Sequence, residues 1–174
     1  MVNQVQFEWK RVSGYLKEVS LCSLILGTLS YVIARTNPDL VDLIFPKATE
    51  ESRRAWFYFL AMYLTVIPVY SVKVSRTLSK HVVPAHSLPK KIAGTIAALG
   101  LLPLLVCAGP GVLMFGADAV GRGHLAYLLL SQSFLGLVSL GAFFSYAAVL
   151  GSGMLFVALP SMWKTSNFNP RIGS

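Results

Sequence analysis

Long apolar segments alternate with short polar segments along the whole chain. The first three apolar segments cover residues 19–34, 55–72 and 92–117, and a fourth runs from His124 to Trp163 without Asp, Glu, Lys or Arg. A helix needs about 20 mostly apolar residues to cross the hydrocarbon layer of a membrane. With their flanking residues the segments reach this length. The pattern therefore predicts an all-α, multi-pass membrane protein with four transmembrane helices.

The fourth apolar segment is too long for a single crossing. As one helix it would measure about 60 Å, which is roughly twice the hydrocarbon thickness. We place a break at Gly151-Ser152-Gly153, because glycine commonly ends helices. The prediction is one membrane domain, residues 1–174, with an amphipathic helix over 1–16, spans over about 16–35, 53–73, 92–117 and 124–150, and an interfacial segment and tail over 151–174.

The amount and distribution of charge agree with four crossings. Only 13% of the 174 residues are charged and the mean hydropathy is +0.63, whereas soluble domains carry about 25% charged residues. With four crossings, the N-terminus, the segment 73–91 and the C-terminal tail share one side and carry the whole net charge of +8. The positive-inside rule then predicts that both termini lie inside, which in a mitochondrion is the matrix side.

Small residues recur at helical spacing in two of the predicted spans. Such stripes let two helices approach closely in a membrane. They predict helix-packing interfaces at Ser20, Ser23, Gly27, Ser30 and Ala34 of the first span and at Gly141, Ser145, Ala148 and Ser152 of the fourth. Because the bundle holds more of these positions than its own packing needs, we expect some of them to contact other membrane proteins.

The first 16 residues predict an amphipathic helix. Val5, Trp9 and Val12 fall on one stripe at spacings of four and three residues, and Lys10 and Arg11 lie off it. A helix of this kind lies on a membrane surface or on a partner's helix. The sequence leaves these two alternatives open.

The segment KHVVPAHSLPKK, residues 80–91, connects the second and third spans. His81 and His86 are five residues apart with Pro84 between them, which does not place two ligands on one helical face. His124 belongs to the opposite side. We therefore predict no metal, haem or other cofactor. The basic residues on this side are predicted to set the topology and to contact anionic phospholipid head groups, including cardiolipin; they are Lys73, Arg76, Lys80, Lys90 and Lys91.

The sequence contains no combination of residues that indicates an enzyme. There is no HExxH or CxxC motif, and no ionisable residue lies in the middle of a span, where proton relays and ion pathways need one. We expect Asp118 and Arg122 to form a surface ion pair at the turn before the fourth span. The basic residues flank apolar helices instead of forming a soluble patch, so a nucleic-acid partner is not expected.

Taken together, these patterns favour a structural, non-catalytic accessory subunit of a large membrane protein complex. A respiratory-chain or ATP synthase assembly of the mitochondrial inner membrane is the first expectation, because such assemblies contain many small helical subunits, and a plastid membrane is the second. The main alternative is a small four-helix transporter or channel whose path uses the Pro and Gly breaks of the third and fourth spans. A haem- or quinone-handling membrane anchor is a third hypothesis.

Overall fold

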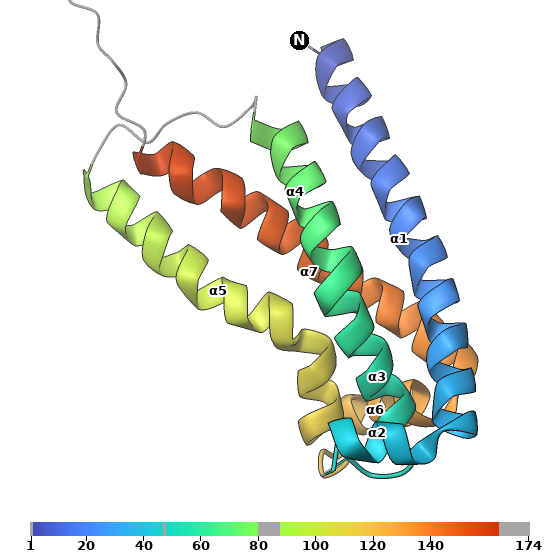
Figure 1. Cartoon of the computed structure of the whole chain (residues 1–174). Coiled ribbons are helices and arrows are strands. Elements are labelled where there is room, and N and C mark those ends of the chain that lie inside the picture. Colours follow the sequence, from blue (N-terminus) through green and yellow to red (C-terminus); the bar gives the residue numbers. More distant parts are fainter. Residues whose placement is uncertain (1, 47, 80–87, 164–174) are drawn as a thin grey trace, which may run out of the picture.

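The computed structural model describes residues 2–46, 48–79 and 88–163. Within them the chain is an all-α multi-pass membrane protein without strands, as predicted. Four helical stretches are long and apolar enough to cross a membrane: Trp9–Thr36, Arg53–Leu78, Leu88–Phe115 and Phe134–Val157. The elements in chain order are α1 (Val2–Thr36), α2 (Pro38–Ile44), α3 (Arg53–Ala61), the π-helical turn η1 (Met62–Val66), α4 (Ile67–Leu78), α5 (Leu88–Phe115), α6 (Arg122–Gln132) and α7 (Phe134–Trp163) (Figure 1).

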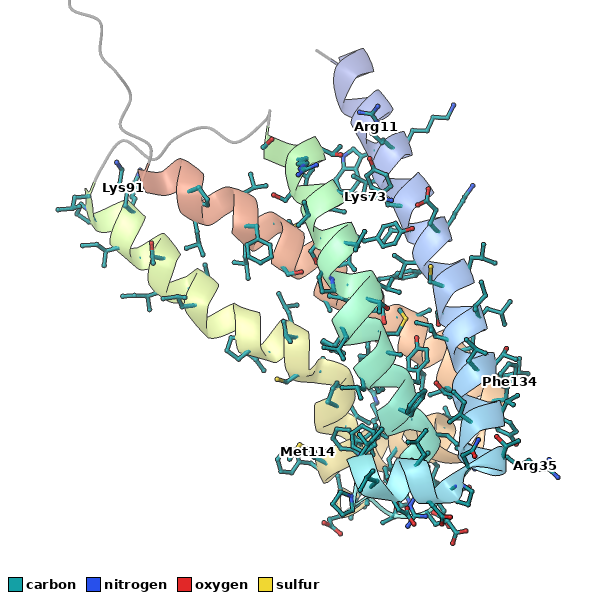
Figure 2. The ribbon with its side chains drawn as sticks, in the orientation of Figure 1. Arg11, Arg35, Lys73, Lys91, Met114 and Phe134 are labelled. Atoms are coloured by element: carbon teal, nitrogen blue, oxygen red, sulfur yellow. The ribbon has the colours of Figure 1, made fainter. Side chains whose placement is uncertain are left out.

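The ends of the helices gather at two opposite ends of the bundle. The start of α1, the end of α4, the start of α5 and the end of α7 lie at one end, which we call the basic end (Figure 1). The short helices α2 and α6 lie at the other, which we call the α2–α6 end. Arg11, Lys73 and Lys91 lie toward the basic end and Arg35 at the α2–α6 end (Figure 2). This grouping is what four crossings require.

The predicted amphipathic helix is not a separate element. It is continuous with the first span, so that α1 is one helix of 35 residues. A single glycine inside a helix costs only about 1 kcal/mol relative to alanine, and the flanking residues of Gly14 are ordinary helix formers. At 1.5 Å per residue α1 is about 52 Å long, which exceeds the thickness of the hydrocarbon layer.

The second crossing is built from α3, η1 and α4. Proline lacks an N–H and its ring clashes with the carbonyl four residues earlier, so Pro68 disturbs the regular hydrogen-bond ladder. The structure absorbs this disturbance in the π-helical turn just before the proline, where the Ile67 N–H bonds to the Met62 carbonyl five residues back. The irregularity that Pro68 causes therefore takes the form of a π turn.

The break in the last apolar segment lies at Ser133, and the predicted break at Gly151-Ser152-Gly153 is wrong. Ser133 has extended backbone angles (φ −100°, ψ 125°) and separates α6 from α7. Its hydroxyl accepts the N–H of Gly136 at 3.1 Å, as an N-cap side chain does. The fourth span is consequently Phe134–Val157 instead of 124–150, and α6 is a separate short helix at the α2–α6 end.

The glycines near residue 151 serve packing instead of ending the helix. A Cβ on Gly153 would lie 2.8 Å from Val74 Cγ1, and a Cβ on Gly151 would lie 2.2 Å from Leu105 Cδ1. A Cβ at either position would require its neighbour to move, so these glycines let α7 lie close to α4 and α5. Glycine is common both at helix ends and at close helix contacts, so the sequence alone does not distinguish the two.

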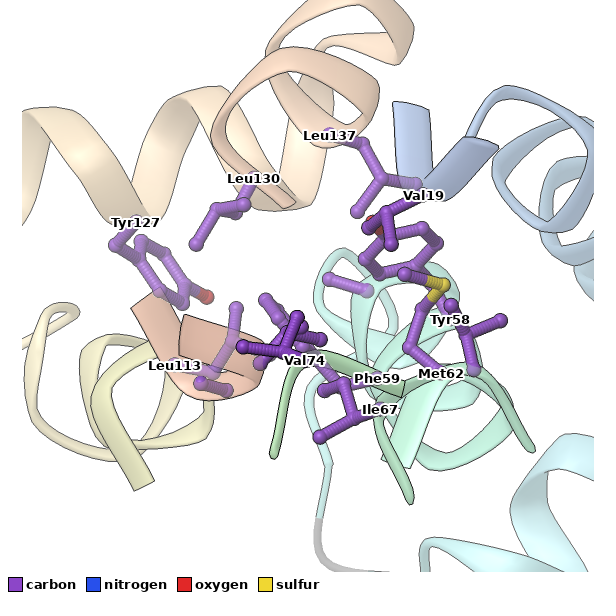
Figure 3. Close-up of a cluster of buried hydrophobic side chains, with 14 residues drawn as sticks. Val19, Tyr58, Phe59, Met62, Ile67, Val74, Leu113, Tyr127, Leu130 and Leu137 are labelled. Carbon is purple, nitrogen blue, oxygen red and sulfur yellow. The ribbon is translucent and has the colours of Figure 1, made fainter. Parts of the chain in front are cut away.

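The second crossing lies at the centre of the bundle. In an apolar window of 18 residues within each span, 39% of the residues are buried for the second crossing, compared with 22% for the first, 19% for the third and 33% for the fourth. Residues from α1, α3, η1, α4, α5, α6 and α7 form the buried cluster around it (Figure 3). Its largest fully buried side chains are Tyr58, Phe59, Met62, Leu130 and Leu137.

Candidate functional site

The buried hydroxyl group of Tyr58 joins three helices. It lies 2.7 Å from Ser23 Oγ of α1, and Ser23 Oγ donates to the Val138 carbonyl of α7 at 3.0 Å. Because the only hydroxyl proton of Ser23 is used in that bond, Tyr58 donates to Ser23. A Cβ on Gly141 would lie 2.5 Å from the Tyr58 ring, so the ring packs directly on the α7 backbone. We call this contact the Tyr58 junction.

The rest of the first small-residue stripe also turns into the bundle. A Cβ on Gly27 would lie 2.8 Å from Val138 Cγ2 of α7. Ser20 Oγ hydrogen-bonds to the Tyr146 hydroxyl of α7, and the buried Ser30 donates to the Leu26 carbonyl of its own helix. Of the predicted interface positions, Ser23, Gly27 and Ser30 are buried, and Ser20 and Ala34 are half-buried.

The second stripe faces α4 as well as α1 and α3. Ser152 Oγ donates to the Ala148 carbonyl, and Ser71 Oγ of α4 lies 2.6 Å from Ser152 Oγ. Ser71 is therefore the donor in the bond between the two helices. The predicted positions Gly141, Ser145, Ala148 and Ser152 are all buried within this chain. The buried positions of both stripes therefore pack within this chain and are not surplus. Contact of the half-buried Ser20 and Ala34 with other membrane proteins stays a prediction.

A polar cluster ties α1 to α4 nearer the basic end. Glu18 Oε2 accepts a hydrogen bond from the Tyr70 hydroxyl at 2.7 Å and lies 3.5 Å from Lys73 Nζ. The Lys73 ammonium also lies 4.4 Å from the centroid of the Tyr70 ring and 5.7 Å from that of Tyr15. Lys73, predicted as a lipid contact, thus has a protein partner. Charge counting could not find it, because Glu18 is 55 residues away in the sequence.

The other described basic residues that are predicted to contact lipid head groups lie at or near the surface of the bundle. Arg76 and Lys90 are exposed and Lys91 is half-buried, all toward the basic end. Lys80 lies outside the described residues, together with His81 and His86. Contact with anionic lipid at this end stays a prediction.

The predicted amphipathic stripe does not present one face to a partner. Val12 is buried within the bundle at 1% exposure, whereas Trp9 is 56% exposed. The side chain of Val5 lies outside the described part of the chain. The prediction of a partner-facing stripe is therefore wrong for Val12, because its side chain is already buried within this chain. Trp9 alone of the three is placed at the surface.

Charged side chains at the α2–α6 end pair across elements. Arg53 Nη1 of α3 lies 2.7 Å from Asp42 Oδ1 of α2, and the Arg54 guanidinium lies 4.7 Å from the centroid of the Tyr31 ring of α1. The expected pair between Asp118 and Arg122 is not formed, although both residues are described and exposed. Gly121, whose φ is 91°, lies in the turn between them.

The described residues do not include a cluster of His, Cys, Asp and Glu side chains that would form a metal site. Cys22 and Cys107 are free thiols on α1 and α5. The strongest candidate for function is thus the network of interhelical hydroxyl contacts described above. Comparison with protein-family models, with curated proteins and with solved structures gives no match to this chain.

Proposed function

We propose that the chain is a structural, non-catalytic accessory subunit of a large membrane protein complex. The observation that carries this proposal is the use of intramembrane polar groups to connect helices. The hydroxyls of Ser23 and Tyr58 bind each other, as do those of Ser71 and Ser152. A transport path or a catalytic site needs polar groups that are free to meet a solute, whereas these groups stabilise the bundle.

The outer surface of the bundle is available for neighbouring subunits. Along α5 the side chains of Ile96, Leu99, Leu104 and Phe115 are each more than half exposed. In a membrane such a face contacts either lipid tails or another transmembrane helix. We propose that other membrane subunits cover part of it, and that anionic phospholipid, with cardiolipin as one choice, binds at the basic end.

The proposed location is the mitochondrial inner membrane, in a respiratory-chain or ATP synthase assembly, with both termini on the matrix side. The excess of basic residues at one end of the bundle supports this orientation through the positive-inside rule. A plastid membrane is the second choice.

The alternative function is a small transporter or channel. One observation favours it: the Tyr63 hydroxyl is buried without a hydrogen-bond partner among the described residues, at the centre of the second crossing. In addition, Pro103 and Pro110 lie inside α5, where they leave backbone carbonyls without their usual partners. A solute that binds between η1 and α5 would use these groups.

Native electrophoresis tests the proposal. Native membranes are extracted with a mild detergent, separated on a native gel, and searched for this chain by mass spectrometry. Co-migration with a large complex is expected, and the double variant His81→Ala, His86→Ala should co-migrate equally well. Migration of the chain as a monomer or small oligomer, under conditions that leave known complexes intact, would contradict the subunit proposal and favour the transporter.

A further inference from the structure

A hollow of about 610 Å³ lies at the α2–α6 end. Its walls come from the end of α2, the connection from α2 to α3, the first turns of α3, the last turn of α5, and α6. Small-molecule sites in proteins typically measure about 300–1,000 Å³. The hollow is therefore large enough for the head group of a lipid and the beginning of its chain.

Three aromatic side chains line this hollow: Phe45, Trp56 and Tyr127. Phe45 and Trp56 stack on one another, with ring centroids 5.8 Å apart and an angle of 30° between the planes. Tyr127 comes from α6 and is buried (Figure 3). The faces of aromatic rings carry partial negative charge and attract cations, Trp most strongly, and several such rings together are the common site for quaternary ammonium groups.

Hydrogen bonds hold the aromatic wall in place. Thr49 Oγ1 lies 2.9 Å from Ser52 Oγ and 3.2 Å from the Tyr127 hydroxyl, and Ser52 Oγ donates to the Thr49 carbonyl at 3.1 Å. These bonds connect α6 to the segment that precedes α3. Tyr127 is therefore fixed before any ligand arrives, which lowers the entropy cost of binding.

The charge of the hollow selects a cation. Asp118 is the one charged side chain among the described residues that line it, and it is exposed. Because the expected pair with Arg122 is not formed, the Asp118 carboxylate is available at the rim. A carboxylate repels phosphate or carboxylate head groups and attracts ammonium groups. A quaternary ammonium suits this site better than a primary amine. It has no N–H group that needs a hydrogen-bond acceptor, and it interacts favourably with aromatic rings alone.

The mouth of the hollow is apolar. Ile44 of α2 and Met114 of α5 line it and are 41% and 60% exposed. Met114 belongs to the last turns of the third span and lies at the α2–α6 end (Figure 2). The end of a span is where the hydrocarbon layer meets the head groups. A ligand with an alkyl chain can leave the hollow along this side without exposing the chain to water.

We propose that this hollow binds the quaternary ammonium head of a membrane lipid, that is, the choline group of a phosphatidylcholine-type molecule. Phe45, Trp56 and Tyr127 line the space that the cation occupies, Asp118 balances its charge, and the acyl chains pass Ile44 and Met114. The site is distinct from the anionic-lipid contacts expected at the basic end, because it lies at the opposite end of the bundle and prefers the opposite charge.

Fluorescence quenching tests the proposal on the full chain in lipid vesicles. The sequence has three tryptophans, and the background variant Trp9→Phe, Trp163→Phe leaves Trp56 as the only emitter. Vesicles of phosphatidylglycerol receive either brominated phosphatidylcholine or brominated phosphatidylglycerol, with bromine close to the head group. We expect half-maximal quenching at about fivefold lower mole fraction of the choline lipid, in line with cation–π and charge contributions of about 1 kcal/mol. Equal quenching by both lipids would overturn the proposal.

A matched pair of variants separates the charge of Asp118 from general surface charge. Asp118→Asn should remove most of the preference for the choline lipid. Asp39→Asn should leave it unchanged, because Asp39 is also exposed at the α2–α6 end but does not line the hollow. An unchanged preference in Asp118→Asn, with helical content intact by circular dichroism, would contradict the assignment of the carboxylate.

Two further experiments complete the test. The first shows whether the ammonium group belongs to a lipid or to a free ion, and the second repeats the comparison of the two lipids without purifying the chain. Tetramethylammonium chloride, which has no chain, should not relieve the quenching; complete relief at millimolar concentration would show a site for free ammonium ions instead of a lipid. In native membranes, a photoactivatable phosphatidylcholine should label peptides from residues 44–56 or 113–127 more than the matching phosphatidylglycerol does. Equal labelling would overturn the proposal even if the purified chain aggregates.

Discussion

The second and third crossings of this bundle are alike in length but opposite in surroundings. The span Arg53–Leu78 has 26 residues and the span Leu88–Phe115 has 28. Yet in an apolar window of 18 residues, 39% of the residues are buried in the first and only 19% in the second. The third span is the more apolar of the two. Apolar character therefore does not decide which helix lies at the centre.

The physical reason is that lipid tails are as apolar as leucine, so burying an aliphatic side chain against protein gains little over leaving it in lipid. Close contacts and interhelical hydrogen bonds remain to select the neighbours. The second crossing has both, in the ring of Tyr58 on Gly141 and in the pair of Ser71 with Ser152. The outer face of α5 carries branched aliphatic side chains, which lipid accommodates equally well.

The largest expected effect comes from removing the ring at the Tyr58 junction. Tyr58→Ala should lower the free energy of unfolding by about 3 kcal/mol, because it opens a cavity and leaves Ser23 without its donor. Leu104→Ala on α5, where the side chain is 70% exposed, should change it by less than about 0.5 kcal/mol. Reversible unfolding in mixed micelles measures both. Similar losses of unfolding free energy in the two variants would contradict the difference in burial between the second and third crossings.

The next effect uses two glycines with opposite surroundings. Gly141→Leu should destabilise the fold by about 1–3 kcal/mol, because its Cβ would lie 2.5 Å from the buried Tyr58 ring. Gly100→Leu on α5 meets nothing within 4 Å of its Cβ and should be neutral or stabilising through helix propensity. The melting temperatures of the two variants in one detergent give the comparison. A melting temperature for Gly141→Leu equal to that of the unsubstituted chain would refute the close approach of α7.

The smallest expected effect concerns a single hydrogen bond between α4 and α7. Ser71→Ala and Ser152→Ala should each cost about 0.6–1.7 kcal/mol, and the double variant should cost clearly less than their sum. Thr28→Ala serves as the control, because Thr28 Oγ1 bonds only to the Leu24 carbonyl of its own helix and is exposed. Additive losses in the double-mutant cycle would show that the two serines do not interact in the membrane.

Several features of the fold could be read from the sequence because they depend on neighbouring residues. The lengths of the apolar segments predict four crossings, and the loop charges predict which segments share an end. The stripes that contain Ser23 and Gly141 predict close helix packing, and both residues lie in helix contacts. Each of these signals is local, since a helix has the same period and a membrane the same thickness wherever they occur.

Which helices those signals bring together was decided only by the tertiary structure. The stripes meet α3, α4 and α7 of the same chain, Glu18 meets Tyr70 and Lys73, and the helix breaks at Ser133 while Gly151 and Gly153 stay helical. The hollow lined by Trp56, Tyr127 and Asp118 draws on segments more than 60 residues apart in the sequence. An apolar helix face has nearly the same free energy against lipid tails as against another apolar helix. Which helices become neighbours therefore depends on shape and on a few hydrogen bonds. The match in shape and the interhelical hydrogen bonds become defined only when the helices lie side by side.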